Sequence, residues 1–254
     1  MKFLNGLKVV LVSFIALILI WQVVFSLSHF NEALFPSPLH AWKALLEMAS
    51  DGSLARHVGT SLYRFACGYV SAVLCAVALG LVLGLLPSVF QFVNPIVQLL
   101  RPISPMAWAP FIVLWFGIGN RPAIVVVFIA AFFPVLLSTV SAVVNIDPIY
   151  HKVAKNFGVK QPALLWKIVF PAAFPQIANG IHLALGTAWV FLAAGEMNGV
   201  QSGLGYMVID ARNSMRTDSL LATILVIGAL GLALDSLLKC AERLFLKAWG
   251  GVEE

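Results

Sequence analysis

Apolar segments long enough to cross a membrane alternate with short polar connections along the whole chain. Six segments carry few or no charged residues, and they lie at about 9–28, 62–86, 90–116, 123–144, 173–195 and 220–238. A helix needs roughly 20 predominantly apolar residues to cross the hydrocarbon core of a bilayer. The pattern therefore predicts an all-α membrane protein, a polytopic bundle of about six transmembrane helices.

The composition supports the membrane class. Hydrophobic residues make up 61% of the 254 residues and charged residues 11%, whereas soluble domains carry roughly a quarter charged residues. The net charge of +5 does not indicate a nucleic-acid partner, because the basic residues lie at segment ends and are not clustered with aromatic residues. Cys67, Cys75 and Cys240 have no metal-ligand spacing, so we expect no metal site and small buried side chains there.

The first 60 residues are expected to form a transmembrane helix and an outer amphipathic segment. Lys2 and Lys8 precede 19 uncharged residues, which is long for the apolar part of a signal peptide, so an uncleaved helix is predicted. Helical spacing predicts a short amphipathic helix on the outer surface, through Leu39, Trp42, Leu45, Leu46 and Ala49. Residues 61–246 would form the transmembrane core, and residues 247–254 a cytoplasmic tail.

The second apolar segment has a small residue at every fourth position. This spacing places the small residues on one helical face, where the backbones of neighbouring helices can approach closely. The stripe consists of Gly68, Ala72, Ala76, Gly80 and Gly84. It fits packing within one subunit and also a contact between two subunits, and the sequence leaves both open.

The third apolar segment cannot form one regular helix. Its centre combines Arg101 with Pro102, Pro105 and Pro110, and each proline lacks a backbone N–H donor. Broken helices in membranes face protein or a water-filled cavity, where the freed backbone groups find partners. Arg101 is costly in hydrocarbon and is therefore a candidate pathway residue. The alternative is an arginine that extends from a helix end to the membrane interface.

The basic residues predict that both termini and one internal connection lie in the cytoplasm. The N-terminus, residues 147–171 and the C-terminus together hold nine of the 16 Lys and Arg residues. Cytoplasmic connections of membrane proteins carry such an excess. The most basic internal connection is 147–171, with Lys152, Lys155, Lys160 and Lys167.

This connection is predicted to form a helix–turn–helix. Asp147 before a proline is a helix-start signal, Gly158 would end the first helix, and Pro171 would mark the turn into the fifth apolar segment. The first helix would have an apolar ridge of Ile149, Val153 and Phe157. Either the ridge lies on the lipid surface with the lysines toward anionic headgroups, or it docks into a groove on a cytoplasmic partner.

The stretch KVAKNFGVKQPALLWKIVFP resembles the cytoplasmic EAA signature of permease subunits of ATP-binding-cassette (ABC) importers. That signature is Glu-Ala-Ala, a glycine, and a hydrophobic stretch that ends at Leu-Pro. Lys152 stands in place of the glutamate, Val153 in place of the first alanine, and Phe170 in place of the leucine. The resemblance implies a hairpin that couples the chain to ATPase subunits through Lys152, Val153, Ala154, Lys155, Phe157, Gly158 and Pro171.

The resemblance covers about residues 61–246. LRPISPMAWAPFIVLWFGIGN and GIHLALGTAWVFLAAGEMNGVQSGLGYM are similar to blocks of the nitrate, sulfonate and taurine permease branch. The family implies a multi-pass protein of the bacterial inner membrane with two cytoplasmic ATPase subunits, a second permease subunit in a homodimer, and an extracytoplasmic solute-binding protein. The partner ATPase would bind ATP and Mg, because this chain has no G-x-x-x-x-G-K-[ST] loop; no cofactor and no enzymatic activity are expected in the chain itself.

Four residues are candidates for the transport pathway: Arg101, His182, Trp189 and Glu196. Arg101 could offer paired donors to an oxyanion, whereas Glu196 would repel it and fits an ion pair or a cap at the end of the fifth segment. A lone histidine such as His182 is more often hydrogen-bonded between helices. Asp235 is expected to pair with Lys239 at helical spacing.

The predicted function is that of the permease subunit of an ATP-driven importer for a small oxyanion such as nitrate, a sulfonate or taurine. One rival is an ATP-independent channel or secondary transporter, which would need no coupling hairpin at 147–171. The other rival is an intramembrane enzyme. It is disfavoured because the sequence has no H-E-x-x-H or G-x-S-x-G motif.

Overall fold

A computed structural model of the chain describes residues 2–27, 34–147, 149–150, 156 and 163–248. These residues are mostly helical and include no strand, which confirms the all-α class. The elements are α1 (Lys2–Leu27), α2 (Pro38–Ser50), α3 (Ser53–Leu85), α4 (Pro87–Leu100), the 3-10 helix η1 (Pro105–Trp108), α5 (Ala109–Phe116), α6 (Asn120–Val144), the π-helix η2 (Leu165–Val169), α8 (Phe170–Glu196), α9 (Leu204–Asn213) and α10 (Thr217–Ala248).

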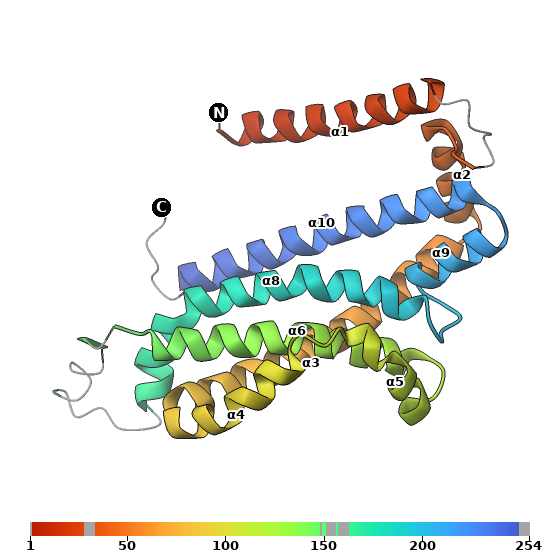
Figure 1. The fold of residues 1–254 in the computed structure, drawn as a ribbon. Helices are drawn as coiled ribbons and strands as arrows, with labels where there is room; N and C mark the ends of the chain where they lie inside the picture. Colours follow the sequence, from red (N-terminus) through yellow and green to blue (C-terminus); the bar gives the residue numbers. More distant parts are fainter. Residues whose placement is uncertain (1, 28–33, 148, 151–155, 157–162, 249–254) are drawn as a thin grey trace.

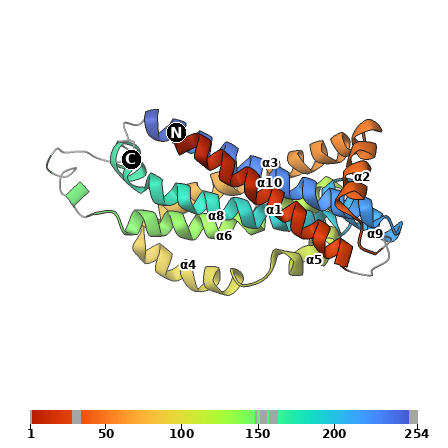
Figure 2. The ribbon, with the colours of Figure 1, turned by 90° about the horizontal axis from the view of Figure 1, so that it is seen from above.

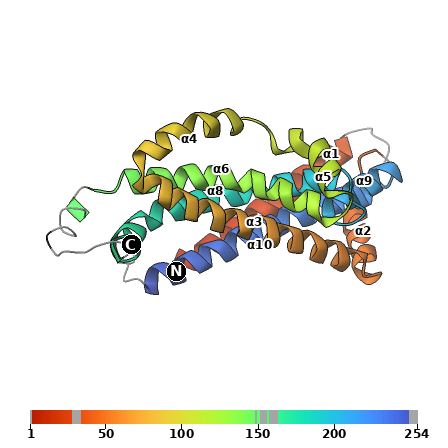
Figure 3. The same ribbon diagram turned by 90° about the horizontal axis from the view of Figure 1, so that it is seen from below.

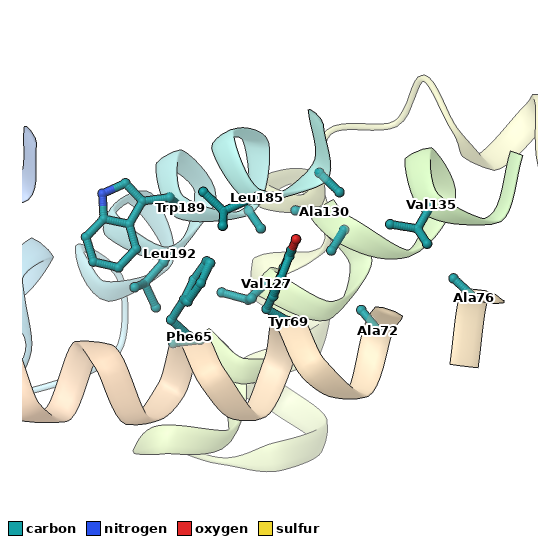
Figure 4. Close-up of a cluster of buried hydrophobic side chains, with 14 of the residues drawn as sticks. Phe65, Tyr69, Ala72, Ala76, Val127, Ala130, Val135, Leu185, Trp189 and Leu192 are labelled. Carbon is teal, nitrogen blue, oxygen red and sulfur yellow. The ribbon is translucent and has the colours of Figure 1, made fainter. Parts of the chain in front are cut away.

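Three long helices, α3, α6 and α8, pack side by side and form the core of the bundle (Figure 1, Figure 2). α10 packs along α8, and α4 runs along the outside of the bundle (Figure 3). Figure 4 shows Phe65 and Tyr69 of α3 pointing toward α8. Phe65 meets the Trp189 ring edge to face at 5.2 Å, and the Tyr69 hydroxyl donates to the Ile181 carbonyl at 2.6 Å. Aromatic contacts and the Tyr69 hydrogen bond thus help to join α3 to α8.

The small-residue stripe of α3 packs against α6 within the same chain. Ala72 and Ala76 are fully buried. A Cβ at Gly68 would lie 2.6 Å from the Ile124 carbonyl oxygen, and a Cβ at Gly80 would lie 2.6 Å from the Thr139 Cβ. Packing within one subunit, one of the two alternatives for this stripe, is therefore what the structure shows.

The third apolar segment is broken as predicted. α4 and the η1–α5 unit are bent by 82° across residues 101–104, where Pro102 interrupts the helix and Pro105 then begins η1. Among the described residues, four other helical runs are long and apolar enough to cross a membrane, and the bent pair would be a fifth crossing if it is one span. α1 adds a shorter apolar helix, Val12–Leu27. The predicted count of six is thus not exact.

α2 confirms the predicted amphipathic helix. The Ser37 hydroxyl accepts from the His40 N–H at its start. Ala41 and Ala44 are buried against the bundle, whereas the larger Leu39, Trp42 and Leu46 are exposed. An exposed apolar face of this kind fits contact with the membrane surface.

The structure describes the two ends of the predicted cytoplasmic hairpin. The Asp147 carboxylate accepts from the Ile149 N–H at 2.8 Å, which is the predicted cap. The prediction that Pro171 marks a turn is wrong. η2 runs directly into α8, so Pro171 lies within a continuous helical run, Leu165–Glu196. The Phe170 N–H donates to the Leu165 carbonyl five residues back, which is a π-turn. This local widening lets the helix continue through Pro171, which has no N–H to donate.

A methyl group added at Gly68 should destabilise this fold, because its nearest neighbour would be the Ile124 carbonyl oxygen, a backbone atom. We expect Gly68→Ala to lower the free energy of unfolding by about 1–3 kcal/mol, measured by denaturant unfolding in detergent micelles. Gly59→Ala is the matched control on the same helix. Its Cβ would meet nothing within 4 Å, so its stability should equal or exceed that of the wild type. Equal stability of the two variants would contradict the close approach of α3 and α6.

Candidate functional site

Arg101 lies where α4 ends. Its N–H still donates to the Val97 carbonyl at 2.9 Å, and the helix stops at the following proline. Ser104 then caps η1, because its hydroxyl oxygen accepts from the Met106 N–H. The break thus leaves Arg101 and Ser104 in a short non-helical connection between two helices.

This connection borders a cleft of about 360 Å³. The opposite walls come from α6 and α8, through Ile129, Ala130, Phe133, Pro134, Thr187 and Phe191. The Thr187 hydroxyl donates to the Ala184 carbonyl of its own helix. Arg101 is exposed, and within the described ranges no hydrogen bond or ion pair to its side chain is found. The cleft therefore presents one unpaired guanidinium beside mostly apolar walls, an arrangement suited to an anionic ligand.

Trp189, another predicted pathway residue, lies in the core. It is 6% exposed, and its ring N–H donates to the Ile227 carbonyl of α10 at 3.0 Å. Its ring also packs next to Gly231 of α10. These contacts give Trp189 a packing role between α3, α8 and α10, and its role in the pathway stays a prediction.

His182 is hydrogen-bonded between helices, as expected. Its Nε2 lies 2.5 Å from Glu242 Oε2 of α10, and its Nδ1 lies 3.8 Å from Asp235 Oδ1. The expected pair of Asp235 with Lys239 is also present, at 2.6 Å. This cluster connects α8 to the C-terminal half of α10.

Glu196 forms an ion pair with a residue that the sequence analysis did not single out. Its Oε1 lies 2.8 Å from Arg64 Nη1, and both side chains are almost fully buried. Its Oε2 accepts from the Ser61 hydroxyl at 2.7 Å and from the Gly205 N–H at 3.1 Å. Glu196 therefore joins α3, α8 and α9, and its pathway role remains untested.

Arg64 has a partner for each part of its guanidinium. Beside Glu196, it donates to Asn120 Oδ1 at 2.9 and 2.8 Å and to the Ser202 carbonyl and hydroxyl at 2.7 Å each. The loop before α9 fits closely over this network, since Gly203 has φ 102° and a Cβ there would collide with the Glu196 carboxylate. The sequence signal that could have identified Arg64 is its position as a charged residue near the start of an apolar segment.

Most of the predicted coupling residues, Lys152, Val153, Ala154, Lys155, Phe157 and Gly158, lie outside the described residues. Pro171 is described, and it sits in the helical run next to Phe170. The coupling role of these residues therefore stays a prediction.

Comparison with known proteins identifies the family. The family described as "Binding-protein-dependent transport system inner membrane component" matches residues 72–247. The chain belongs to this family. It is 32% identical over 240 residues to the taurine transport system permease protein TauC of Escherichia coli (strain K12), across 92% of this chain and 87% of TauC. It is 31% identical over 233 residues to the nitrate import permease protein NrtB of Leptolyngbya laminosa, across 89% and 83% of the two chains.

A solved structure shares the fold. An inward-facing form of the MetNI methionine ABC transporter matches with a TM-score of 0.55 at 19% identity, over 74% of this chain and 95% of that one.

The family match and the relatives show what the chain does. It is the permease subunit of a binding-protein-dependent ABC importer and a multi-pass inner-membrane protein. It is a component of the membrane pathway rather than an enzyme, and it works with separate ATPase and solute-binding proteins.

Removing one partner of the buried ion pair should be more harmful than removing both. Arg64→Leu leaves the Glu196 carboxylate buried without its counter-charge, which costs about 3–5 kcal/mol of unfolding free energy. The double variant Arg64→Leu/Glu196→Leu removes both charges, so it should lose less. Denaturant unfolding of the purified variants in detergent measures both values, and a double variant less stable than Arg64→Leu would contradict this account.

Proposed function

We propose that the chain forms the membrane pathway for a small oxyanion, as one of two identical permease subunits in an importer driven by separate ATPase subunits. The observation that carries this proposal is the unpaired Arg101 guanidinium in the cleft between α4, α6 and α8. The alternative of an arginine reaching the membrane interface is disfavoured by its position along the bundle. The α6 residues that line the same cleft, Ile129, Ala130, Phe133 and Pro134, lie near the middle of this 25-residue helix.

The chemistry of the cleft favours an oxyanion. A guanidinium presents a planar fork of N–H donors that matches two oxygens of one anion. Ser104 adds a hydroxyl whose oxygen already accepts from Met106, so its own hydrogen remains to donate. The names of TauC and NrtB give taurine and nitrate as their solutes. The sulfonate group of taurine and the nitrate ion each have three oxygens around a central atom. Two of these oxygens can accept hydrogen bonds from the N–H donors of one guanidinium.

An exposed stripe of α8 supports a homodimer. Asn179, Leu183, Gly186 and Val190 are exposed and recur at intervals of three or four residues beside the cleft. A Cβ at Gly186 would meet nothing within 4 Å, so this face is open for a close helix contact. A two-fold axis would bring the same stripe of a second copy against it and would place a cleft from each subunit on one pathway.

Energy would enter at the cytoplasmic end. Two ATPase subunits would bind ATP and Mg and act on the hairpin at 147–171, whose four lysines and Asp147 cap fit a cytoplasmic helical connection. The same excess of basic residues supports a cytoplasmic position for both termini.

Arg101→Ala should reduce transport without dissociating the ATPase subunits. Loss of a charge-assisted contact to an anion is worth about 1.5–3 kcal/mol, which predicts at least a tenfold loss in the ratio of maximal uptake rate to half-saturating solute concentration. Uptake of radiolabelled solute into proteoliposomes measures this ratio, and co-purification measures the subunits. Arg121→Ala is the matched control, because Arg121 is also exposed but lies at the start of α6 away from the cleft. Unchanged uptake by the Arg101 variant would refute its pathway role.

Deletion of residues 153–158 should abolish both transport and ATPase co-purification, because it removes the predicted coupling segment. Insertion into the membrane should be unaffected, since the four long apolar helices remain. Affinity purification of the tagged permease followed by uptake assays tests this. Transport retained by the deletion variant would instead support an ATP-independent carrier.

A further inference from the structure

The Arg101 cleft has more room and more apolar wall than a small inorganic anion can use. Its volume is about 360 Å³, and eight of the eleven described residues that line it are apolar. Phe133 of α6 and Phe191 of α8 are the two largest of these apolar side chains, and both keep some exposed surface. In another protein, an apolar cavity of about 150 Å³ holds one benzene molecule. The cleft can therefore hold a ring of that size together with an anionic group.

The side-chain hydrogen-bond donors of the cleft lie on one of its walls. Arg101 and Ser104 both belong to the connection between α4 and η1. The Ser104 oxygen accepts from the Met106 N–H, so its hydroxyl hydrogen is left to donate. On α8, the Thr187 hydroxyl already donates to the Ala184 carbonyl, so it offers the cleft only an acceptor oxygen. An anionic group would thus bind beside Arg101 and Ser104, and the rest of the solute would face α6 and α8.

The charge of the cleft favours a solute with a single negative charge. Arg101 is the one ionisable residue among the described residues that line it. A dianion such as sulfate would keep one charge unpaired against apolar walls. A solute ammonium group would also lack a partner, because the described lining contains neither Asp nor Glu. Desolvation of an unpaired charge costs free energy, so the cleft discriminates against both kinds of solute.

We propose that the solute of this cleft is an organic monoanion, with a sulfonate-like oxyanion group on an apolar body about the size of a benzene ring and with no ammonium group. The oxyanion would accept from Arg101 and Ser104, and the apolar body would pack against the two phenylalanines. Nitrate would use the donors alone, and taurine would bring an uncompensated ammonium to the apolar walls. The inference rests on the proposed function, because it names the class of oxyanion for the same cleft.

Direct binding to the permease–ATPase complex in nanodiscs tests this class. The binding protein is omitted, because its own specificity would decide which solute reaches the cleft. Isothermal titration calorimetry with benzenesulfonate, ethanesulfonate, taurine and nitrate gives their dissociation constants. Benzenesulfonate should bind about tenfold more tightly than ethanesulfonate, because its ring buries more apolar surface. Ethanesulfonate should bind about fivefold more tightly than taurine, which differs from it by an ammonium group in place of one hydrogen.

Variants of the aromatic wall test where the apolar body lies. Phe191→Ala should weaken benzenesulfonate binding about tenfold and ethanesulfonate binding less than about twofold. Phe191→Leu keeps an apolar side chain, so it should weaken benzenesulfonate only about two- to threefold and distinguishes a lost contact from a lost fold. Phe92→Ala is the matched control, because Phe92 is 79% exposed on α4 and does not line the cleft. Equal weakening of both sulfonates in both Phe191 variants would overturn the assignment of this wall.

Three other outcomes would decide against the proposal in distinguishable ways. If Arg101→Ala binds every anion as the wild type does, the proposed function fails and this inference fails with it. If Arg101→Ala weakens all the anions but nitrate or taurine binds the wild type as tightly as benzenesulfonate, the inference alone fails. If benzenesulfonate gives the same heats with empty nanodiscs as with the complex, it partitions into lipid and does not bind the cleft.

Discussion

The close approach of α3 to α6 is the contact on which the other features depend. Lipid tails are as apolar as the side chains they meet, so helices in a bilayer are held by tight packing and hydrogen bonds rather than by burial itself. The small residues Gly68 and Gly80 bring the two helices together, and α6 then carries the wall that faces Arg101. The cleft geometry is therefore set by contacts on the opposite face of α6.

Two arginines in apolar segments have opposite surroundings. Arg64 is 1% exposed and satisfied by Glu196, Asn120 and Ser202, so it holds the ends of several helices together. Arg101 is exposed and has no such partners among the described residues. A buried and fully paired arginine acts as a structural clamp, whereas an unpaired one in a cleft is available to a solute.

α8 connects three parts of the molecule that the proposed transport cycle would use. Pro171 and the π-turn lie at its start, next to the connection that is predicted to couple to the ATPase. Thr187 lines the cleft, and Glu196 completes the hydrogen-bond network beside α9. The α9 helix held by that network also packs against α10. A movement of α8 would therefore reach the cleft and the α9 end of the bundle through packed contacts, without any separate connecting element.

The sequence by itself determined the all-α membrane class, the broken third segment with Arg101, the Asp147 cap and the Asp235–Lys239 pair, because these depend on composition and on neighbours within one or two helical turns. Its family resemblance also predicted the importer permease. Only the tertiary structure decided that the stripe of α3 packs on its own α6, that Pro171 continues a helix, and that Glu196 pairs with Arg64 across 132 positions. Contacts between residues so far apart follow from the packing of helices, which local periodicity does not encode.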